Sequence, residues 1–250
     1  KNMPDDFPAA DRERLTAAYR NAIEERVFRA YRQLQTFIRK EYLPACREGA
    51  PGLLTMKDGE ALYQGLIERY TTTDMTAEEI HAIGLREVER ITREMDAIRT
   101  QLGFEGTLRE FFDHVRNDPR FRFASKEALL DGYAAIRTRV DAAVPLLFSL
   151  TPDTPFEIRP VPAYSEKFEA AAFYRQGTPD GSRPGVFFVN TYDLPSRTSV
   201  GVETLFLHEA IPGHHFQISL AQENESLPAF MRFGGTPAFV EGWALYAESL

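Results

Sequence analysis

The sequence predicts a mainly α-helical protein of the α+β class, in which long N-terminal helices accompany a small β-sheet. Apolar residues recur every three or four positions through most of residues 1–150, which is the period of a helix. The stretch "TPDTPFEIRPVPAY" at 151–164 contains four prolines, which exclude a helix there. The run "GVFFVNTY" at 185–192 is rich in β-forming residues. We therefore expect a helical region over 1–150 and a second region over 151–250.

The first predicted helix covers about residues 11–42. Pro8 lies just before this helix and Pro44 closes it, as is typical of helix boundaries. Its apolar stripe consists of Leu15, Ala18, Tyr19, Ala22, Ile23, Val27, Ala30, Tyr31, Leu34, Phe37 and Ile38. A turn with Pro and Gly follows at 49–52, and we expect a shorter helix over 58–69.

Three further helices are expected before residue 150. Thr76 is the expected N-cap of the first, because Glu79 stands three positions later and completes a capping box. This helix should end near Gly103, since glycine commonly follows a helix C-terminus. The second should begin at Thr107, and the third should span about 125–147.

The second region is expected to contain both strands and helices. The segment "FEIRPV" at 156–161 suits an edge strand, because its proline cannot donate a hydrogen bond to a neighbouring strand. Helical patterns return at about 199–210 and at 236–250. The chain stops inside the last pattern, without a glycine cap or a following loop. We therefore expect it to be a fragment that lacks a C-terminal part.

Composition narrows the function. Hydrophobic residues make up 43% and charged residues 26%, as in an ordinary soluble globular protein. The net charge of −8 argues against nucleic-acid binding, which needs a basic face. No apolar run approaches the roughly 18–20 residues of a transmembrane helix, and the first residues lack a signal-peptide pattern. Cys46 is the only cysteine, so neither an internal disulfide nor a cysteine-based zinc site can form.

The stretch "HEAIPGHH" at 208–215 holds three of the five histidines and nearly spells the zinc-protease signature H-E-x-x-H. On an unbroken helix, His214 would point about 120° away from His208, and His215 would lie about 10 Å further along the axis. A break at Pro212 and Gly213 removes this objection, because it can return either histidine to the metal-facing side. The alternative is a helix that ends at Pro212, followed by two histidines in a loop.

A third ligand should come from another element. Glu241 lies in the strongly apolar helical pattern "TPAFVEGWALYAE", where a buried carboxylate would be costly unless it were paired or bound a metal. Glu248 follows two turns later on roughly the same face and is a candidate to orient a ligating histidine. The alternative is that Glu241 faces water without a ligand.

Together, "HEAIPGHHFQ" and "FVEGWALYAE" resemble the domain-of-unknown-function 885 family, a group of metallopeptidase-like bacterial proteins. That family is grouped with the gluzincins, whose motif H-E-x-G-H is here lengthened by two residues. The resemblance implies one zinc ion on His208, His214 and Glu241. It implies Glu209 as the general base. His215 is the alternative ligand, or otherwise a group that stabilises the oxyanion or binds substrate.

The resemblance also implies where a peptide would bind and where the protein would reside. Gluzincins commonly hold the substrate backbone on an edge strand, and "GVFFVNT" at 185–191 is the candidate strand, with Asn190 as a peptide contact. The alternative for this segment is an ordinary half-buried strand. Family members are often lipoproteins, which suggests export or a lipid anchor in bacteria. The sequence leaves the compartment, the substrate sequence, the cleavage mode and the oligomeric state open.

Three functions are compatible with these residues. The leading one is a zinc-dependent peptidase in which Glu209 activates water for attack on a peptide bond. The second is a catalytically inactive module that binds metal or peptide. The third is an iron oxygenase with two histidines and one carboxylate, although such enzymes favour β-rich scaffolds. Glu209 would have a chemical role only in hydrolysis, as the general base, and this favours the peptidase.

Overall fold

The computed structural model describes residues 6–49 and 52–250 of the chain. The chain divides into two compact units, Lys1–Gly59 and Glu60–Leu250. The predicted turn at 49–52 includes residues 50 and 51, which lie outside the described residues, as do the first five residues of the predicted helical region. Each unit is described by itself below.

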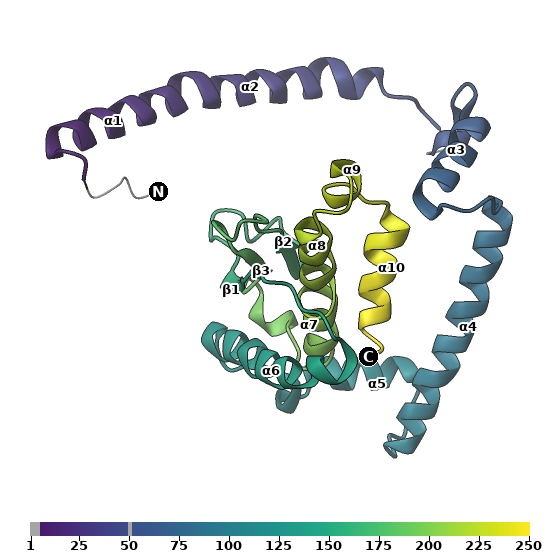
Figure 1. Cartoon of the computed structure of the whole chain (residues 1–250). Helices are drawn as coiled ribbons and strands as arrows, with labels where there is room; N and C mark the ends of the chain where they lie inside the picture. The colour runs from purple at the N-terminus through teal and green to yellow at the C-terminus, as the bar shows by residue number, and fades with distance from the viewer. Residues whose placement is uncertain (1–5, 50–51) are drawn as a thin grey trace. The chain divides into compact units, whose positions relative to one another are not determined.

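The first unit is dominated by one long helical segment (Figure 1). It consists of α1 (Ala9–Ala22) and α2 (Phe28–Phe37), each continued by one wider π-helical turn at Ile23–Val27 and Ile38–Tyr42. Short 3-10 turns follow at Leu43–Ala45 and Leu53–Thr55. This confirms the helix predicted over 11–42. None of the described residues of α1 and α2 is buried.

The second unit begins with four helices, three of which start directly after the predicted residues Thr76, Thr107 and Ser125. They are α3 (Gly59–Thr71), α4 (Ala77–Gln101), α5 (Leu108–Asn117) and α6 (Lys126–Leu147). Thr76 and Thr107 each form a complete capping box with a glutamate three positions later. The Ser125 hydroxyl accepts a hydrogen bond from the Ala128 N–H at the start of α6. The structure confirms the predicted helices. They could be predicted because the signals at their starts are local.

A three-stranded sheet follows, made of β1 (Phe156–Pro160), β2 (Ala172–Arg175) and β3 (Gly185–Val189). The strand order is β1-β3-β2, with β1 parallel and β2 antiparallel to β3. All five residues of β3 are buried, which is typical of a central strand covered on both faces. The edge position predicted for 156–161 is confirmed.

The last helices are α7 (Val202–Glu209), α8 (His214–Glu223), α9 (Ala229–Arg232) and α10 (Pro237–Ala247). Short 3-10 turns stand at Pro119–Phe121 and Leu194–Ser196. Helix α7 starts at Val202, three residues after the predicted position of 199, and the preceding Gly201 has a φ of 86° that suits glycine. Helix α10 packs against both α7 and α8 (Figure 1).

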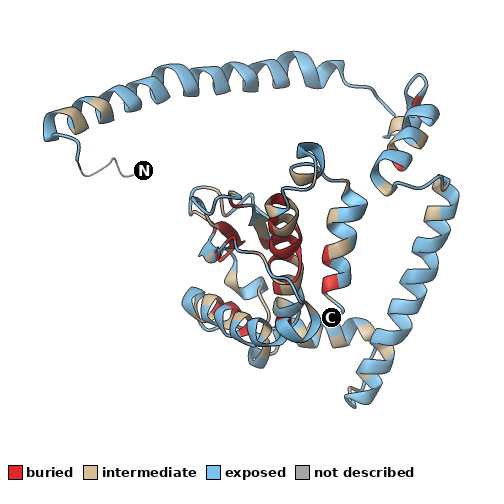
Figure 2. Cartoon of the chain, in the orientation of Figure 1, coloured by how far each residue is buried: buried red, intermediate tan, exposed pale blue. Residues whose placement is uncertain are grey.

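The main core joins elements from both sides of residue 150. Leu129 and Tyr133 of α6 pack with Phe187 of β3 and Phe206 of α7, and Phe187 and Phe206 are completely buried. Buried residues concentrate in the sheet and in α6 to α8 (Figure 2). The structure therefore divides the chain differently from the boundary expected at 150, because α6 shares its hydrophobic core with the strands that follow it.

Within the part of the chain that the structure describes, no helix combines the length and the low charge needed to cross a membrane.

Candidate metal centre

The stretched motif is built on an interrupted helix. Helix α7 ends at Glu209, helix α8 begins at His214, and the four residues between them leave helical geometry. The peptide bond before Pro212 is cis. Gly213 lies so close to the preceding turn that a Cβ there would stand 1.9 Å from the His208 carbonyl oxygen. Only glycine fits at that position without a backbone shift.

The break brings three expected ligands together. The Nε2 atoms of His208 and His214 lie 3.4 and 3.6 Å from the same carboxylate oxygen of Glu241. One donor atom from each residue lies within 4.8 Å of the other two, so the group could hold a metal ion. The two imidazole rings stand nearly perpendicular, with centroids 4.7 Å apart. Of the two histidines that the break could have turned toward His208, the structure places His214 there.

Glu241 reaches the histidines in a different way from the one expected. The Glu241 side chain is 57% exposed, so its position beside the histidines does not result from the cost of burying a carboxylate. Helix α10 is open on one side, and its apolar Phe239 and Leu245 are exposed as well. The position of Glu241 instead depends on how α10 is held. The Trp243 indole N–H donates to the Pro212 carbonyl oxygen at 2.7 Å, and the Gln217 side-chain amide donates to the Phe239 carbonyl oxygen at 3.0 Å.

Glu248, the candidate to orient a ligating histidine, lies beside His208. Its Oε1 atom lies 2.8 Å from Nδ1 of His208. A carboxylate bonded to Nδ1–H selects the tautomer in which Nε2 carries a lone pair, and it also orients the ring. Nε2 is the atom that faces Glu241 and His214. The Glu248 contact therefore favours the His208 tautomer whose Nε2 lone pair faces Glu241 and His214.

Glu209 is buried beside this cluster, with 9% of its surface exposed. Its Oε2 atom accepts a hydrogen bond of 2.9 Å from the backbone N–H of Tyr174 in β2. Burial raises the pKa of the Glu209 carboxyl, while neighbouring His208 and the Tyr174 N–H oppose that shift. A raised pKa suits a carboxylate that takes up and releases a proton near neutral pH. Sequence reasoning missed Tyr174, because its contact joins residues 35 positions apart.

His214 and His215 are adjacent but face different surroundings. Burial lowers the pKa of His214, which keeps its imidazole neutral as a metal ligand must be. Nδ1 of His215 instead lies 2.9 Å from the Tyr174 hydroxyl, and its ring packs on Phe156 with centroids 4.6 Å apart. Burial lowers the pKa of His215 to about 4. His215 lies outside the cluster that the described residues form, so the structure gives no support to it as the alternative ligand.

The prediction of a substrate-holding edge strand at 185–191 is wrong. Strand β3 is the central strand and pairs on both sides, so its backbone has no free edge for a peptide. Asn190 is 1% exposed, and its amide donates to the carbonyl oxygens of Glu166 and Glu169. It holds the segment before β2 in place instead of contacting a peptide. The edge strand next to Glu209 is β2.

Comparison with known proteins identifies the family. The sequence matches the family described as "Bacterial protein of unknown function (DUF885)" over residues 1–250, and the chain belongs to it. No curated protein matches the chain. A solved structure, "The crystal structure of the putative lipoprotein from Colwellia psychrerythraea", is similar with a TM-score of 0.92 and 29% sequence identity. The similarity covers 98% of this chain and 42% of that one. The chain therefore spans less than half of the length of this relative.

Proposed function

We propose that this chain carries the metal site of a zinc-dependent peptidase, with His208, His214 and Glu241 as the ligands. One observation carries the proposal. The three side chains converge from α7, α8 and α10 to within 4.8 Å, directly beside the buried Glu209. A metal site without catalysis has no evident need for a second buried carboxylate next to the ligands.

The donor set fits zinc. Two imidazole nitrogens and one carboxylate oxygen form a ligand set used by catalytic zinc, which keeps a further position for water or substrate. Glu248 on Nδ1 of His208 supplies the outer hydrogen bond that zinc-binding histidines almost always make. When bound, zinc would lower the pKa of a coordinated water and polarise a peptide carbonyl.

Glu209 would move the proton. The Tyr174 N–H fixes its Oε2 atom, and none of the other described residues donates a hydrogen bond to Oε1. Oε1 is therefore available to take a proton from an attacking water and to pass it to the leaving amine. The raised pKa of Glu209 helps the carboxyl group to hold that proton during the transfer.

Strand β2 is suited to hold a peptide backbone. It pairs with β3 on one side only, so its other edge can accept an added strand. The Tyr174 N–H on that free edge points to Glu209, so a peptide beside β2 would pass close to the proposed base. We also propose that the protein is exported or lipid-anchored, because the similar Colwellia psychrerythraea structure is described as a lipoprotein.

Elemental analysis of the purified protein tests the metal site. We expect about one zinc ion per chain and its loss in His208→Ala. The matched control is His81→Ala, because His81 is exposed on α4 and far from the motif in sequence. Absence of zinc after purification without chelators, and after its addition, would refute the site.

Hydrolysis of a peptide mixture tests catalysis separately. Glu209→Gln should keep the zinc and lower kcat/KM by about 10²- to 10⁴-fold, since it removes the proton acceptor. Full turnover by Glu209→Gln would contradict the mechanism. Zinc retention without hydrolysis by the parent protein would identify a non-catalytic metal-binding module, and iron in place of zinc would redirect attention to redox chemistry.

A further inference from the structure

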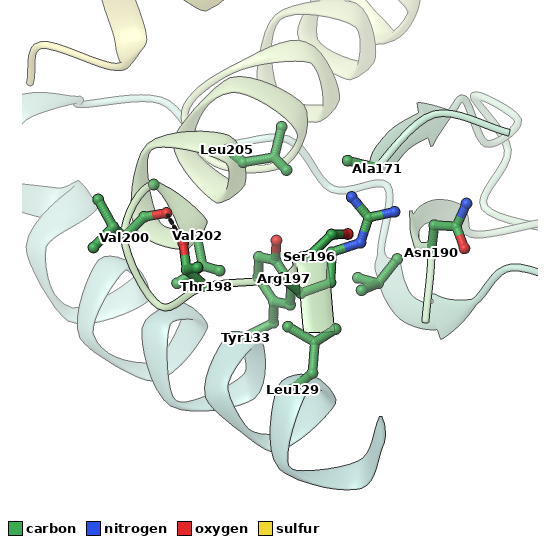
Figure 3. Close-up of a pocket in the computed structure, with 12 residues that line it drawn as sticks. Leu129, Tyr133, Ala171, Asn190, Ser196, Arg197, Thr198, Val200, Val202 and Leu205 are labelled. Carbon is green, nitrogen blue, oxygen red and sulfur yellow. Dashed lines mark hydrogen bonds between the residues drawn. The ribbon is translucent and has the colours of Figure 1, made fainter. Parts of the chain in front are cut away.

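A second candidate site lies at the other end of α7, outside the metal cluster. A cavity of about 170 Å³ opens where α6, the end of β3 and the start of α7 meet (Figure 3). Its lining is largely aliphatic, with Leu129, Val189 and Leu205 among the side chains. Arg197 and Tyr133 are the polar side chains of the lining that make no hydrogen bond to any residue that the structure describes. Figure 3 shows both of them among the lining side chains.

The Arg197 side chain has a buried N–H group, at Nε, without an acceptor among the described residues. No carboxylate within the described part of the chain forms an ion pair with it, although most other arginines of the second unit bond an acidic side chain or a carbonyl oxygen. The Arg197 side chain is partly exposed, and a buried N–H group without an acceptor is unfavourable. Such a group indicates that an anion completes the site.

Tyr133 adds a neutral donor. Its side chain is 3% exposed, and its hydroxyl makes no hydrogen bond within the described residues. Burial raises the pKa of Tyr133 to about 12, although the positive charge of Arg197 lowers it somewhat. The hydroxyl therefore stays protonated at neutral pH and can donate to an anion. An arginine fork and one hydroxyl are well suited to a planar carboxylate.

The start of α7 also favours an anion in the cavity. Val200, Gly201 and Val202 line the cavity, and no side chain among the described residues caps this helix at Gly201. Its first N–H groups and the positive end of its dipole therefore favour a nearby negative charge. The segment that carries Arg197 is anchored, because the Ser199 N–H donates to the Phe121 carbonyl oxygen at 2.7 Å.

The cavity adjoins the proposed reaction site along one helix face. Leu205 lines the cavity, and Glu209 lies four positions later, so both face the same side of α7. Ala171, which also lines the cavity, stands three positions before Tyr174, whose N–H bonds Glu209. Three residues of extended chain span about 10 Å. A group in the cavity would therefore lie roughly one to three peptide residues from Glu209.

We propose that this cavity binds a carboxylate of the peptide substrate, with Arg197 as the charged partner and Tyr133 as the hydrogen-bond donor. The proposal rests on the proposed peptidase function for the identity of the ligand. The carboxylate belongs either to the C-terminus of the peptide or to an acidic side chain. Both sources present the same group to Arg197, and a matched set of peptides distinguishes them.

The test measures binding of three peptides to the Glu209→Gln protein, which prevents turnover. The peptides are N-acetyl-trialanine, its C-terminal amide, and the same amide with one alanine replaced by glutamate. We expect the free acid to bind about 10- to 100-fold more tightly than the plain amide, since a hydrogen-bonded charge is lost in the amide. Tight binding of the glutamate-containing amide alone would assign the pocket to an acidic side chain.

Arg197→Met should remove the preference for the carboxylate, and Arg86→Met on exposed α4 is the matched control that should keep it. Arg197→Met should also unfold at the same temperature or a higher one, because it removes a buried N–H group that has no acceptor. Should Arg197→Met fail to fold, Tyr133→Phe provides the same test with the loss of one hydroxyl, and a weaker preference is expected.

Equal binding of acid and amide by the parent protein would overturn the proposal, and so would a preference that persists in both variants. Repeating the titration after zinc removal with a chelator keeps the two proposals apart. If the untreated parent protein neither holds zinc nor hydrolyses peptides but still prefers the carboxylate, only the peptidase proposal is refuted. If it hydrolyses peptides without that preference, only the pocket proposal is refuted.

Discussion

Helices α1 and α8 differ in how far their residues are buried, although both contain regularly spaced apolar residues. None of the described residues of α1 is buried, whereas α8 buries six of its ten residues. The buried residues of α8 include polar side chains such as His214, His215 and Ser219. Apolar periodicity therefore identifies a helix but not its importance. Buried polar side chains that need particular partners mark the region where function is expected.

The same contrast extends to α2 and α7. Large apolar side chains of α2, such as Tyr31 and Leu34, are at least half exposed, whereas Phe206 of α7 is completely buried. Fold stability should therefore depend on α7 and its neighbours much more than on the N-terminal helices. The following three substitution experiments test this difference.

The largest contrast is expected from truncating one apolar side chain in each region. Phe206→Ala should lower the free energy of unfolding of the second unit by about 3–5 kcal/mol, because it opens a cavity between the sheet and α7. Leu34→Ala should change stability by about 0.5 kcal/mol or less, since its side chain is half exposed. Urea unfolding measures both values. A loss at Leu34 as large as that at Phe206 would show that α2 is covered in solution.

The next effect concerns pH. Burial lowers the pKa of His215 to about 4, whereas a histidine in the unfolded chain has a pKa of about 6.5. The unfolded state therefore binds the proton first as the pH falls. The contribution of neutral His215 to the free energy of unfolding is fully present above pH 6.5. It is lost as the pH falls toward 4, and the total loss is about 3 kcal/mol.

Urea unfolding of chelator-treated protein between pH 7 and pH 4.5 measures this loss. His215→Gln should flatten the decline, because glutamine takes up no proton in this range. The exposed His81→Gln is the control and should keep the parental slope. An unchanged slope in His215→Gln would contradict the assignment of the acid sensitivity to this buried ring.

The smallest expected effects come from the same Gly→Ala substitution at two different glycines. Gly213→Ala forces a Cβ against the His208 carbonyl oxygen and should cost about 1–3 kcal/mol, with weaker zinc binding because His214 shifts. Gly84→Ala on exposed α4 meets no atom within 4 Å and should stabilise the helix by about 0.5–1 kcal/mol. Thermal unfolding and zinc titration read both effects. Equal stability changes at the two sites would exclude the tight break at Gly213.

Much of the helical framework could be predicted because its signals are local. The hydroxyl oxygens of Thr76, Thr107 and Ser125 each accept a hydrogen bond from the N–H three positions later at the start of a helix. The motif at 208–215 also indicated a break, since proline and glycine act on their own turn. Predictions that required a neighbour in space were weaker. The segment 185–191 has the composition of a strand, but its composition does not say how many strands pair with it.

The sequence by itself determined the mainly helical class, the helix starts, and the residue types from which a metal site can be made. The tertiary structure decided that His214 faces His208 and Glu241, that His215 turns to Tyr174, and that Asn190 is an internal brace. It also brought Arg197 and Tyr133 into one cavity. The reason is physical. Capping and backbone breaks act within a few residues, whereas the direction of each side chain depends on long-range contacts such as that of Trp243 with Pro212, 31 positions apart.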